Sequence, residues 1–305
     1  MTERTSQRVF AGVFLAPAFF LFTGFVALPG ARALLYSLQK WDGLGRAEWI
    51  GLENFARLFQ QGDLFLKALG HNLFIMGAAG SSVIGLALLF AALLHRRIRG
   101  AQLFRVAFFF PNVIAAVAVA LLWVLLYSTT HFGIVNAFLA QVQSGCHALG
   151  WTWPNWRLPV PFLDSRFLIY SVVPMIIWEV TGFYMVLFLA AMEGIPESYY
   201  EAAKLDGATG FQQFRHITLP LIREVLTVGL VFLMISTLKF FDAIWVMENQ
   251  TPTRDSHVLA TLLYQKVFTE YNVGYGSAVA VCLFVLVFLG TLVSLRLSRA
   301  ERIEY

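Results

Sequence analysis

Charged side chains are scarce in this sequence. Asp, Glu, Lys and Arg make up 13% of its 305 residues, about half the share typical of soluble proteins, whereas 58% of the residues are hydrophobic. A soluble protein of this size needs a charged surface to stay dispersed, so this composition excludes a water-soluble globular domain. Glycine and proline occur at ordinary levels, which excludes collagen-like and disordered chains. The composition therefore indicates an integral membrane protein.

The sequence also lacks the residue patterns that carry catalysis. Its two cysteines are Cys146, in a polar connection, and Cys282, in an apolar run, and we interpret both as free thiols. No G-x-x-x-x-G-K-[ST] phosphate loop occurs, so we do not expect this chain to hydrolyse ATP. The histidines and cysteines show no zinc-binding spacing. We therefore expect no enzyme active site, no metal and no cofactor in this chain, and nothing in it points to nucleic acid.

Six apolar runs are long enough to cross a bilayer as helices, which takes roughly 20 residues. The runs do not alternate as barrel strands do, and the first is longer than the apolar part of a signal peptide. The predicted spans cover residues 9–29, 72–94, 103–127, 167–192, 225–246 and 275–295. Together they predict an all-α membrane protein with a single domain over 9–297, between a short N-terminal segment (1–8) and a tail (298–305).

The distribution of Lys and Arg predicts the orientation. With the N-terminus in the cytoplasm, the inner segments hold eleven Lys and Arg residues, and the outer segments hold nine in nearly twice the length. Cytoplasmic loops carry an excess of basic residues, and the strongest contribution here is the run HRRIR at 95–99. We therefore expect both termini, and the 193–224 segment, to lie in the cytoplasm.

The outer connection at 147–162 is rich in tryptophan and proline. Trp151, Trp153 and Trp156 fall within it, and indole rings favour the headgroup level of a bilayer. An aromatic belt and a docking surface for an outer partner are two compatible interpretations, of which the sequence favours the belt.

One inner segment, residues 195–220, has the pattern of a helical hairpin. It reads IPESYYEAAKLDGATGFQQFRHITLP, with Pro196 and Glu197 suited to the first turn of a helix. Asp206 and Gly207 form a stop-and-turn signal, and residues 209–216 can form a second short helix that ends at Leu219-Pro220. Small alanine side chains in the first helix permit close approach to another surface. The segment is therefore predicted to press against a cytoplasmic partner.

The same segment resembles the EAA signature of ABC-importer permeases. The full spacing EAA-x3-G-x9-I-x-L-P is present, and the resemblance extends over residues 17–297, nearest to the carbohydrate branch with its maltose- and glycerol-phosphate-type permeases. GLENF at 51–55 and Phe241-Asp242 also resemble segments of that branch. One segment departs, because the chain has MENQTP at 247–252 where the family usually has Thr-x-Gly-Gly-Pro.

The resemblance implies the fold and the partners. The fold would be a type I importer permease with a five-helix core and an extra first helix, in a bacterial-type inner membrane. A second permease, usually a paralogue, would complete the pore, and two cytoplasmic ATPase subunits would bind ATP and Mg. An extracytoplasmic solute-binding protein would deliver a sugar, an oligosaccharide or a glycerol-phosphate-like solute. The residues that the resemblance assigns to the ATPase contact are Glu201, Ala202, Ala203, Gly207, Ile217, Leu219 and Pro220.

Ionisable residues inside the spans are candidates for the solute pathway, because a charge in the bilayer is costly. Glu179 lies near the middle of the fourth span, and Phe183 shares its helix face four residues later. A carboxylate beside an aromatic ring suits the hydroxyls and the apolar ring face of a sugar. Pairing of Glu179 with the partner permease is an equally supported alternative.

Three polar residues in other spans are weaker candidates. Lys239 and Asp242, three residues apart on the fifth span, are expected to pair on one helix face, with solute contact as the alternative. Asn112 follows Pro111 in the third span and either faces the pore or holds helices together. A stand-alone ion- or proton-coupled secondary transporter is the alternative function, although no inverted repeat is evident.

Overall fold

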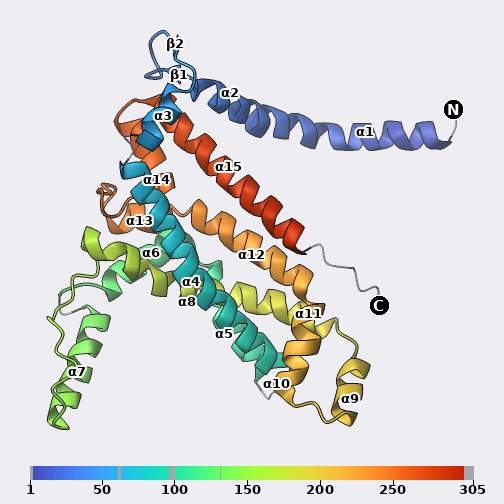
Figure 1. Cartoon of the computed structure of the whole chain (residues 1–305), viewed down its shortest axis with the longest axis vertical. Coiled ribbons are helices and arrows are strands. Elements are labelled where there is room, and N and C mark those ends of the chain that lie inside the picture. The colour runs from blue at the N-terminus through green and yellow to red at the C-terminus, as the bar shows by residue number, and fades with distance from the viewer. Residues whose placement is uncertain (1–2, 61–62, 96–99, 131, 299–305) are drawn as a thin grey trace. The chain divides into compact units, whose positions relative to one another are not determined.

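The computed structural model describes residues 3–60, 63–95, 100–130 and 132–298, most of them helical (Figure 1). The arginines at 96, 97 and 99 and the tail from residue 299, which contribute to the predicted orientation, lie outside the described residues. The chain divides into two units, residues 1–66 with 262–284 and residues 67–261 with 285–305, and each is described by itself. Three helices run from one unit into the other, namely α4 (Asp63–His95), α14 (Leu259–Tyr264) and α15 (Val273–Ser298).

The first unit consists of an N-terminal helix and a small assembly of short helices and strands. Its further elements are α1 (Glu3–Phe22), a π-helical turn η1 (Thr23–Ala27), α2 (Leu28–Tyr36), β1 (Gln39–Lys40), β2 (Glu48–Trp49), α3 (Glu53–Gln60) and a π-helical turn η3 (Gln265–Thr269). The two short strands pair antiparallel. The buried amide of Asn54 on α3 donates to the carbonyls of Ser37 and Gln39, both at 2.9 Å, and so ties α3 to the chain that follows α2.

The second unit contains the remaining helices. They are α5 (Ala101–Val113), α6 (Ala116–Leu126), α7 (Ile134–Ala148), α8 (Ser165–Glu193), α9 (Glu197–Leu205), α10 (Gly210–Gln213), a π-helical turn η2 (Phe214–Thr218), α11 (Leu219–Leu221), α12 (Arg223–Leu238) and α13 (Asp242–Met247). α8 is apolar on all sides and supplies residues to both hydrophobic clusters of this unit, as expected of a helix enclosed by others.

The packing of α5 on α8 depends on a glycine. A Cβ atom at Gly182 of α8 would lie 1.9 Å from the carbonyl oxygen of Phe108 on α5, so only glycine lets the two backbones come this close. The N-terminus of α8 is capped by Asp164, whose carboxylate accepts a hydrogen bond of 2.9 Å from the Arg166 backbone. Both features fix the central helix of the unit.

Each of the six predicted spans is largely helical, but the third is sharply bent and the fifth is interrupted between Leu238 and Asp242. Among the described residues, five helices are long and apolar enough to cross a membrane, and α5 with α6 forms a pair bent by 97°. This corrects the prediction of one continuous helix over 103–127. Pro111 lacks a backbone N–H and interrupts the hydrogen bonding of the last turn of α5. Ile114 and Ala115 then take extended conformations before α6 begins.

Candidate functional site

The first limb of the 195–220 hairpin forms as its sequence predicts. Pro196 stands directly before α9, and Glu197 lies in its first turn, where a carboxylate favours the positive end of the helix. α9 ends at Leu205, directly before Asp206 and Gly207, and Gly207 has a φ of +78°, in the left-handed region that favours glycine. The backbone N–H of Ala208 then donates to the carbonyl of Ala203 at 2.9 Å and closes the turn.

The second limb begins with a capping box and continues further than predicted. Thr209 and Gln212 exchange side-chain and backbone hydrogen bonds at the start of α10. Pro220 was expected to end this limb, but it lies in the first turn of α11, where proline needs no N–H partner. Ile222 donates to Thr218 and Leu226 donates to Ile222, so helical turns carry the chain into α12. The hairpin is therefore joined to its transmembrane helix without a loop.

The hairpin presents several predicted contact residues to solvent. Glu201, Ala202, Gly207 and Pro220 are exposed, while Ala203, Ile217 and Leu219 are half-buried. Two large apolar side chains nearby, Leu205 and Phe211, are 90% and 71% exposed. An uncovered apolar surface of this kind in a folded segment is characteristic of a protein contact.

A polar cavity of about 1190 Å³ lies beneath the hairpin, and the sequence reasoning missed its residues. The Tyr200 hydroxyl lies 3.0 Å from the Thr218 hydroxyl, which links the two limbs. The ring of His95 at the end of α4 lies 5.7 Å from the Tyr200 ring. Arg105 of α5 donates to Glu193 of α8 at 2.7 Å in the same cavity. The ring contact joins the hairpin to α4, and the Arg105–Glu193 pair joins α5 to the end of α8, next to the hairpin. The only feature of the sequence that pointed to these cavity residues was the presence of charged residues at the ends of apolar runs.

A smaller cavity of about 210 Å³ brings three predicted pathway residues together. Glu179 from α8 lines it with Lys239, which caps α12, and Asp242, the first residue of α13. Aromatic and hydroxyl groups complete the polar and apolar lining, namely Tyr184, Phe240, Phe241, Ser236 and Thr237. The cavity thus combines two carboxylates, one ammonium and ring faces.

Phe183 and Asn112 are not among the residues that line this cavity. The Phe183 ring stands edge-on to the Tyr184 ring, with centroids 5.2 Å apart. Asn112 is half-buried in the last turn of α5, just before the bend to α6. Tyr184, one residue beyond Phe183, is therefore the aromatic residue of α8 nearest Glu179 in sequence that lines the cavity.

The predicted pairing of Lys239 with Asp242 on one helix face is corrected by the structure. α12 ends at Leu238 and α13 begins at Asp242, and Phe241 between them has a φ of −137°. Because the helix is interrupted, spacing by three residues no longer places the side chains on one face. No ion pair joins these two described residues.

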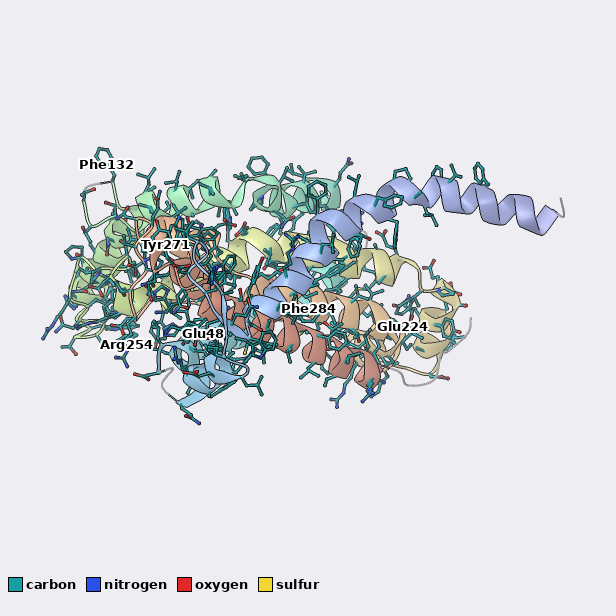
Figure 2. The ribbon with its side chains drawn as sticks, turned by 90° about the horizontal axis from the view of Figure 1, so that it is seen from above. Glu48, Phe132, Glu224, Arg254, Tyr271 and Phe284 are labelled. Carbon is teal, nitrogen blue, oxygen red and sulfur yellow. The ribbon has the colours of Figure 1, made fainter. Side chains whose placement is uncertain are left out.

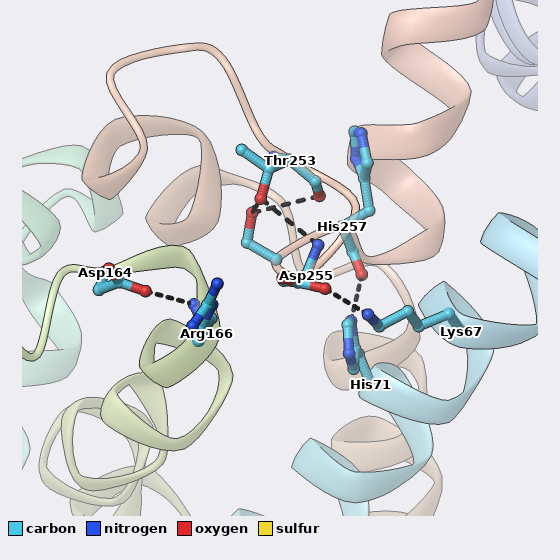
Figure 3. A network of polar contacts seen from close by, with 8 residues as sticks. Lys67, His71, Asp164, Arg166, Thr253, Asp255 and His257 are labelled. Atoms are coloured by element: carbon cyan, nitrogen blue, oxygen red, sulfur yellow. Dashed lines mark hydrogen bonds and ion pairs between the residues drawn. The ribbon is translucent and has the colours of Figure 1, made fainter.

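The loop after α13 is held to α4 by long-range polar contacts (Figure 3). Lys67 donates to the carboxylate of Asp255, and the ring Nδ1 of His71 lies 2.7 Å from the carbonyl of His257. The hydrogen bond from Lys67 and its positive charge hold the pKa of the Asp255 carboxyl below its usual value. The partners stand far apart in the chain, and the sequence reasoning missed them. We call this set of contacts the outer clasp.

The segment MENQTP at 247–252, which stands where the family usually has a glycine-containing loop, lies just before the outer clasp. Asn249 and Gln250 have φ values of 50° and 65°, in the left-handed region. Asn is among the residues that enter this region most readily after glycine. The segment therefore turns sharply without glycine. Within the described residues, no three His, Cys, Asp or Glu side chains gather as metal ligands.

Comparison with known proteins decides the family. Residues 83–303 match the family described as the inner membrane component of binding-protein-dependent transport systems. The chain belongs to this family. The permease is 31% identical over 286 residues to the diacetylchitobiose uptake system permease protein NgcF of Streptomyces coelicolor, covering 90% of this chain and 76% of that one. It is 30% identical over 303 residues to the sulfoquinovosyl glycerol transport system permease protein SmoG of Agrobacterium fabrum, covering 97% and 92%.

The fold of the permease is shared with a solved transporter. A bacterial ABC transporter that imports the acidic polysaccharide alginate contains a chain with a TM-score of 0.78 and 24% identity, covering 97% of this chain and 99% of that one. The predicted all-helical permease fold and the ABC-importer resemblance are therefore confirmed. The family excludes the alternative of a stand-alone secondary transporter.

Proposed function

We propose that this permease is one of two pore subunits of an ATP-driven importer for a saccharide. The observation that carries the proposal is the folded hairpin of α9 and α10, with exposed Glu201, Ala202 and Gly207 beside uncovered Leu205 and Phe211. It fits the docking of a separate ATPase, because small residues at the turn let a partner come close to the backbone. Ala203, Ile217 and Leu219 are half-buried and would support the hairpin from within, whereas Pro220 is exposed.

The hairpin would transmit the work of that ATPase. Two ATPase subunits, binding ATP and Mg, would move the hairpins of both permeases when they close. The helical connection through α11 supports direct transfer of this movement to α12. The contacts of Tyr200 with Thr218 and His95, and of Arg105 with Glu193, would spread it to α4, α5 and α8.

The proposal includes the orientation and the remaining partners. The excess of Lys and Arg on the hairpin side supports cytoplasmic termini and a cytoplasmic hairpin. A solute-binding protein would then deliver the saccharide at the opposite face, and a paralogous permease would complete the pore. One related structure is described as an alginate transporter in complex with its alginate-bound periplasmic protein.

The saccharide class is proposed from relatives and from the small cavity. Relatives are named for diacetylchitobiose, sulfoquinovosyl glycerol and starch degradation products, the last in Thermoanaerobacterium thermosulfurigenes at 27% identity over 96% of this chain and 94% of that one. Glu179, Lys239 and Asp242 offer hydrogen bonds to hydroxyls, and Tyr184 and Phe240 offer ring faces. Pairing of Glu179 with the second permease remains the alternative role.

Purification of the tagged permease from its native membranes tests the function. We expect an ATPase, a second permease and a solute-binding protein to accompany it. In vesicles, the assembly should take up the saccharide carried by that binding protein only when ATP is present on the ATPase side. Uptake by the permease alone, driven by a proton or sodium gradient without ATP, would contradict the proposal.

A further inference from the structure

The segment between α6 and α8 forms an arm that leaves the neighbouring helices (Figure 1). It contains α7 and an extended stretch, residues 151–162, that folds back along α7. Asn136 of α7 donates to the Val160 carbonyl at 3.1 Å and accepts from the Val160 N–H at 2.8 Å. Gln143 accepts from the Trp156 N–H at 3.0 Å. The arm, residues 128–164, therefore has its own internal structure.

One face of the arm is apolar and uncovered. Ile134 and Phe138 are exposed on one stripe of α7, and the exposed Leu149, which caps the helix, continues the direction of that stripe. Gln141 and Gly145 lie on the same stripe between them. Trp151 and Trp153 of the extended stretch are 63% and 73% exposed. The residues that bind the extended stretch lie on the other side of α7. Phe132, just before the helix, also points away from the chain (Figure 2).

The arm has almost no charge. Histidines aside, Arg157 is the only charged residue between Tyr127 and Asp164. A surface that docks a soluble protein usually has a charged, polar rim around its apolar core. The headgroup region of a bilayer instead favours apolar side chains combined with indole rings.

Both ends of the arm reach the membrane. α8, which follows the arm, is long and apolar enough to span the bilayer, and α6, which precedes it, is the apolar second half of the bent α5–α6 pair. At its base, the Tyr127 hydroxyl donates to the Ser171 carbonyl of α8 at 2.8 Å. The arm therefore begins and ends at the membrane surface where α6 ends and α8 starts.

We propose that the arm lies on this membrane surface, with the stripe of Ile134, Phe138 and Leu149 and the indoles of Trp151 and Trp153 among the lipid headgroups. The occupant of the apolar face is lipid. Attachment there holds the start of α8, the helix that carries Glu179, at a fixed depth through the Asp164 cap and the Tyr127–Ser171 hydrogen bond.

Spin labels on the full permease test this placement. Cys146 and Cys282 are first replaced by alanine, and single cysteines are then placed at Phe138, at Trp153 and, as a control, at Ser144. Ser144 is exposed and lies about 120° around the helix from Phe138. The permease is placed in nanodiscs of phosphatidylethanolamine and phosphatidylglycerol. Labels at 138 and 153 should collide more often with oxygen than with a water-soluble nickel chelate. The ratio of the oxygen collision rate to the chelate collision rate should be several-fold higher at these two positions than at 144.

Two results would overturn the proposal. One is equal access of the nickel chelate to positions 138, 153 and 144. The other is protection of 138 and 153 only after the co-purified solute-binding protein is added, which would make the arm a protein docking surface.

Brominated lipids give a second measurement without labels. They should quench less of the tryptophan fluorescence in the Trp151→Phe, Trp153→Phe double variant than in the unaltered permease. An unchanged quenchable fraction would also exclude lipid contact.

Discussion

The α9–α10 hairpin and the small cavity lined by Glu179 are built in different ways. The hairpin is held by contacts close in sequence, such as the Thr209–Gln212 capping box and the turn at Gly207. The cavity is assembled from α4, α8 and the α12–α13 break, segments separated by long stretches of chain. Its walls depend on close helix packing, including the contact of Gly182 with α5.

This difference has a consequence for function. Because the hairpin carries its own local hydrogen bonds, changes on its exposed face should alter docking without unfolding the membrane helices. Changes in the helix packing around the cavity should instead reduce the amount of folded permease. Variants in the two regions should therefore separate loss of coupling from loss of structure.

The largest effect is expected from Gly182→Ala, which disrupts the helix packing. The added methyl group would meet the Phe108 carbonyl at 1.9 Å, so α5 and α8 must separate. Overpacking of this kind costs about 1–3 kcal/mol, and a clash with backbone lies at the upper end. We expect a lower melting temperature and less protein in the membrane. Gly85→Ala is the control, because a Cβ atom added at Gly85 would have no neighbouring atom within 4 Å.

An unchanged melting temperature for Gly182→Ala would show that α5 and α8 do not pack this closely. Substitutions around the cavity would then be expected to leave the permease folded, as substitutions on the exposed face of the hairpin are.

The next effect is expected from Ala202→Glu and Gly207→Asp in the hairpin. Both positions are exposed, and Asp is one of the few residues that enter the left-handed region required at position 207, so the permease should reach the membrane at normal levels. A carboxylate without a partner in a docking surface is costly, and uptake and ATPase retention on purification should both fall. Lys204→Gln, on the cavity side of α9, is the control for altered charge. Normal uptake with full ATPase retention in both variants would remove the hairpin as the coupling element.

Glu179→Gln should have a smaller and more selective effect. The substitution keeps the shape of the side chain and removes its charge, so assembly should persist while solute uptake slows. Ser81→Ala, at an exposed position of α4, is the control. Measured uptake kinetics and gel filtration of the complex separate the alternatives. Loss of the complex would favour pairing with the second permease, and unchanged kinetics would exclude Glu179 from the pathway.

The smallest effect is expected at the outer clasp. A carboxyl whose pKa is lowered by folding stabilises the folded state above its unfolded pKa of about 3.9, and this contribution is lost as pH falls below it. At pH 7, Asp255→Asn should increase hydrogen exchange in residues 253–258 relative to the unaltered permease. The difference should shrink as pH falls below about 4 and vanish once the Asp255 carboxyl is protonated in the folded state, and Lys67→Met should reproduce the faster exchange at pH 7. A difference that persists at low pH would show that the Asp255 charge is not responsible.

Much of the fold could be predicted because its signals are local. Six apolar runs identify the membrane helices, since length and hydrophobicity alone decide whether a helix can cross a bilayer. Pro196, Gly207 and the EAA spacing located the hairpin, because caps and turns need particular residues at particular positions. Pro220 was misinterpreted, since proline is equally suited to the first turn of a new helix.

The sequence by itself determined the membrane class, the family and the hairpin, because each depends on residue types over short stretches. Tertiary structure decided the bend between α5 and α6 and the break before Asp242, where helices must fit their neighbours. It also decided which residues meet, including Glu179 with Asp242 and Lys67 with Asp255. Such contacts depend on the separation and rotation of packed helices, and neither quantity is encoded in the spacing of residues along one segment.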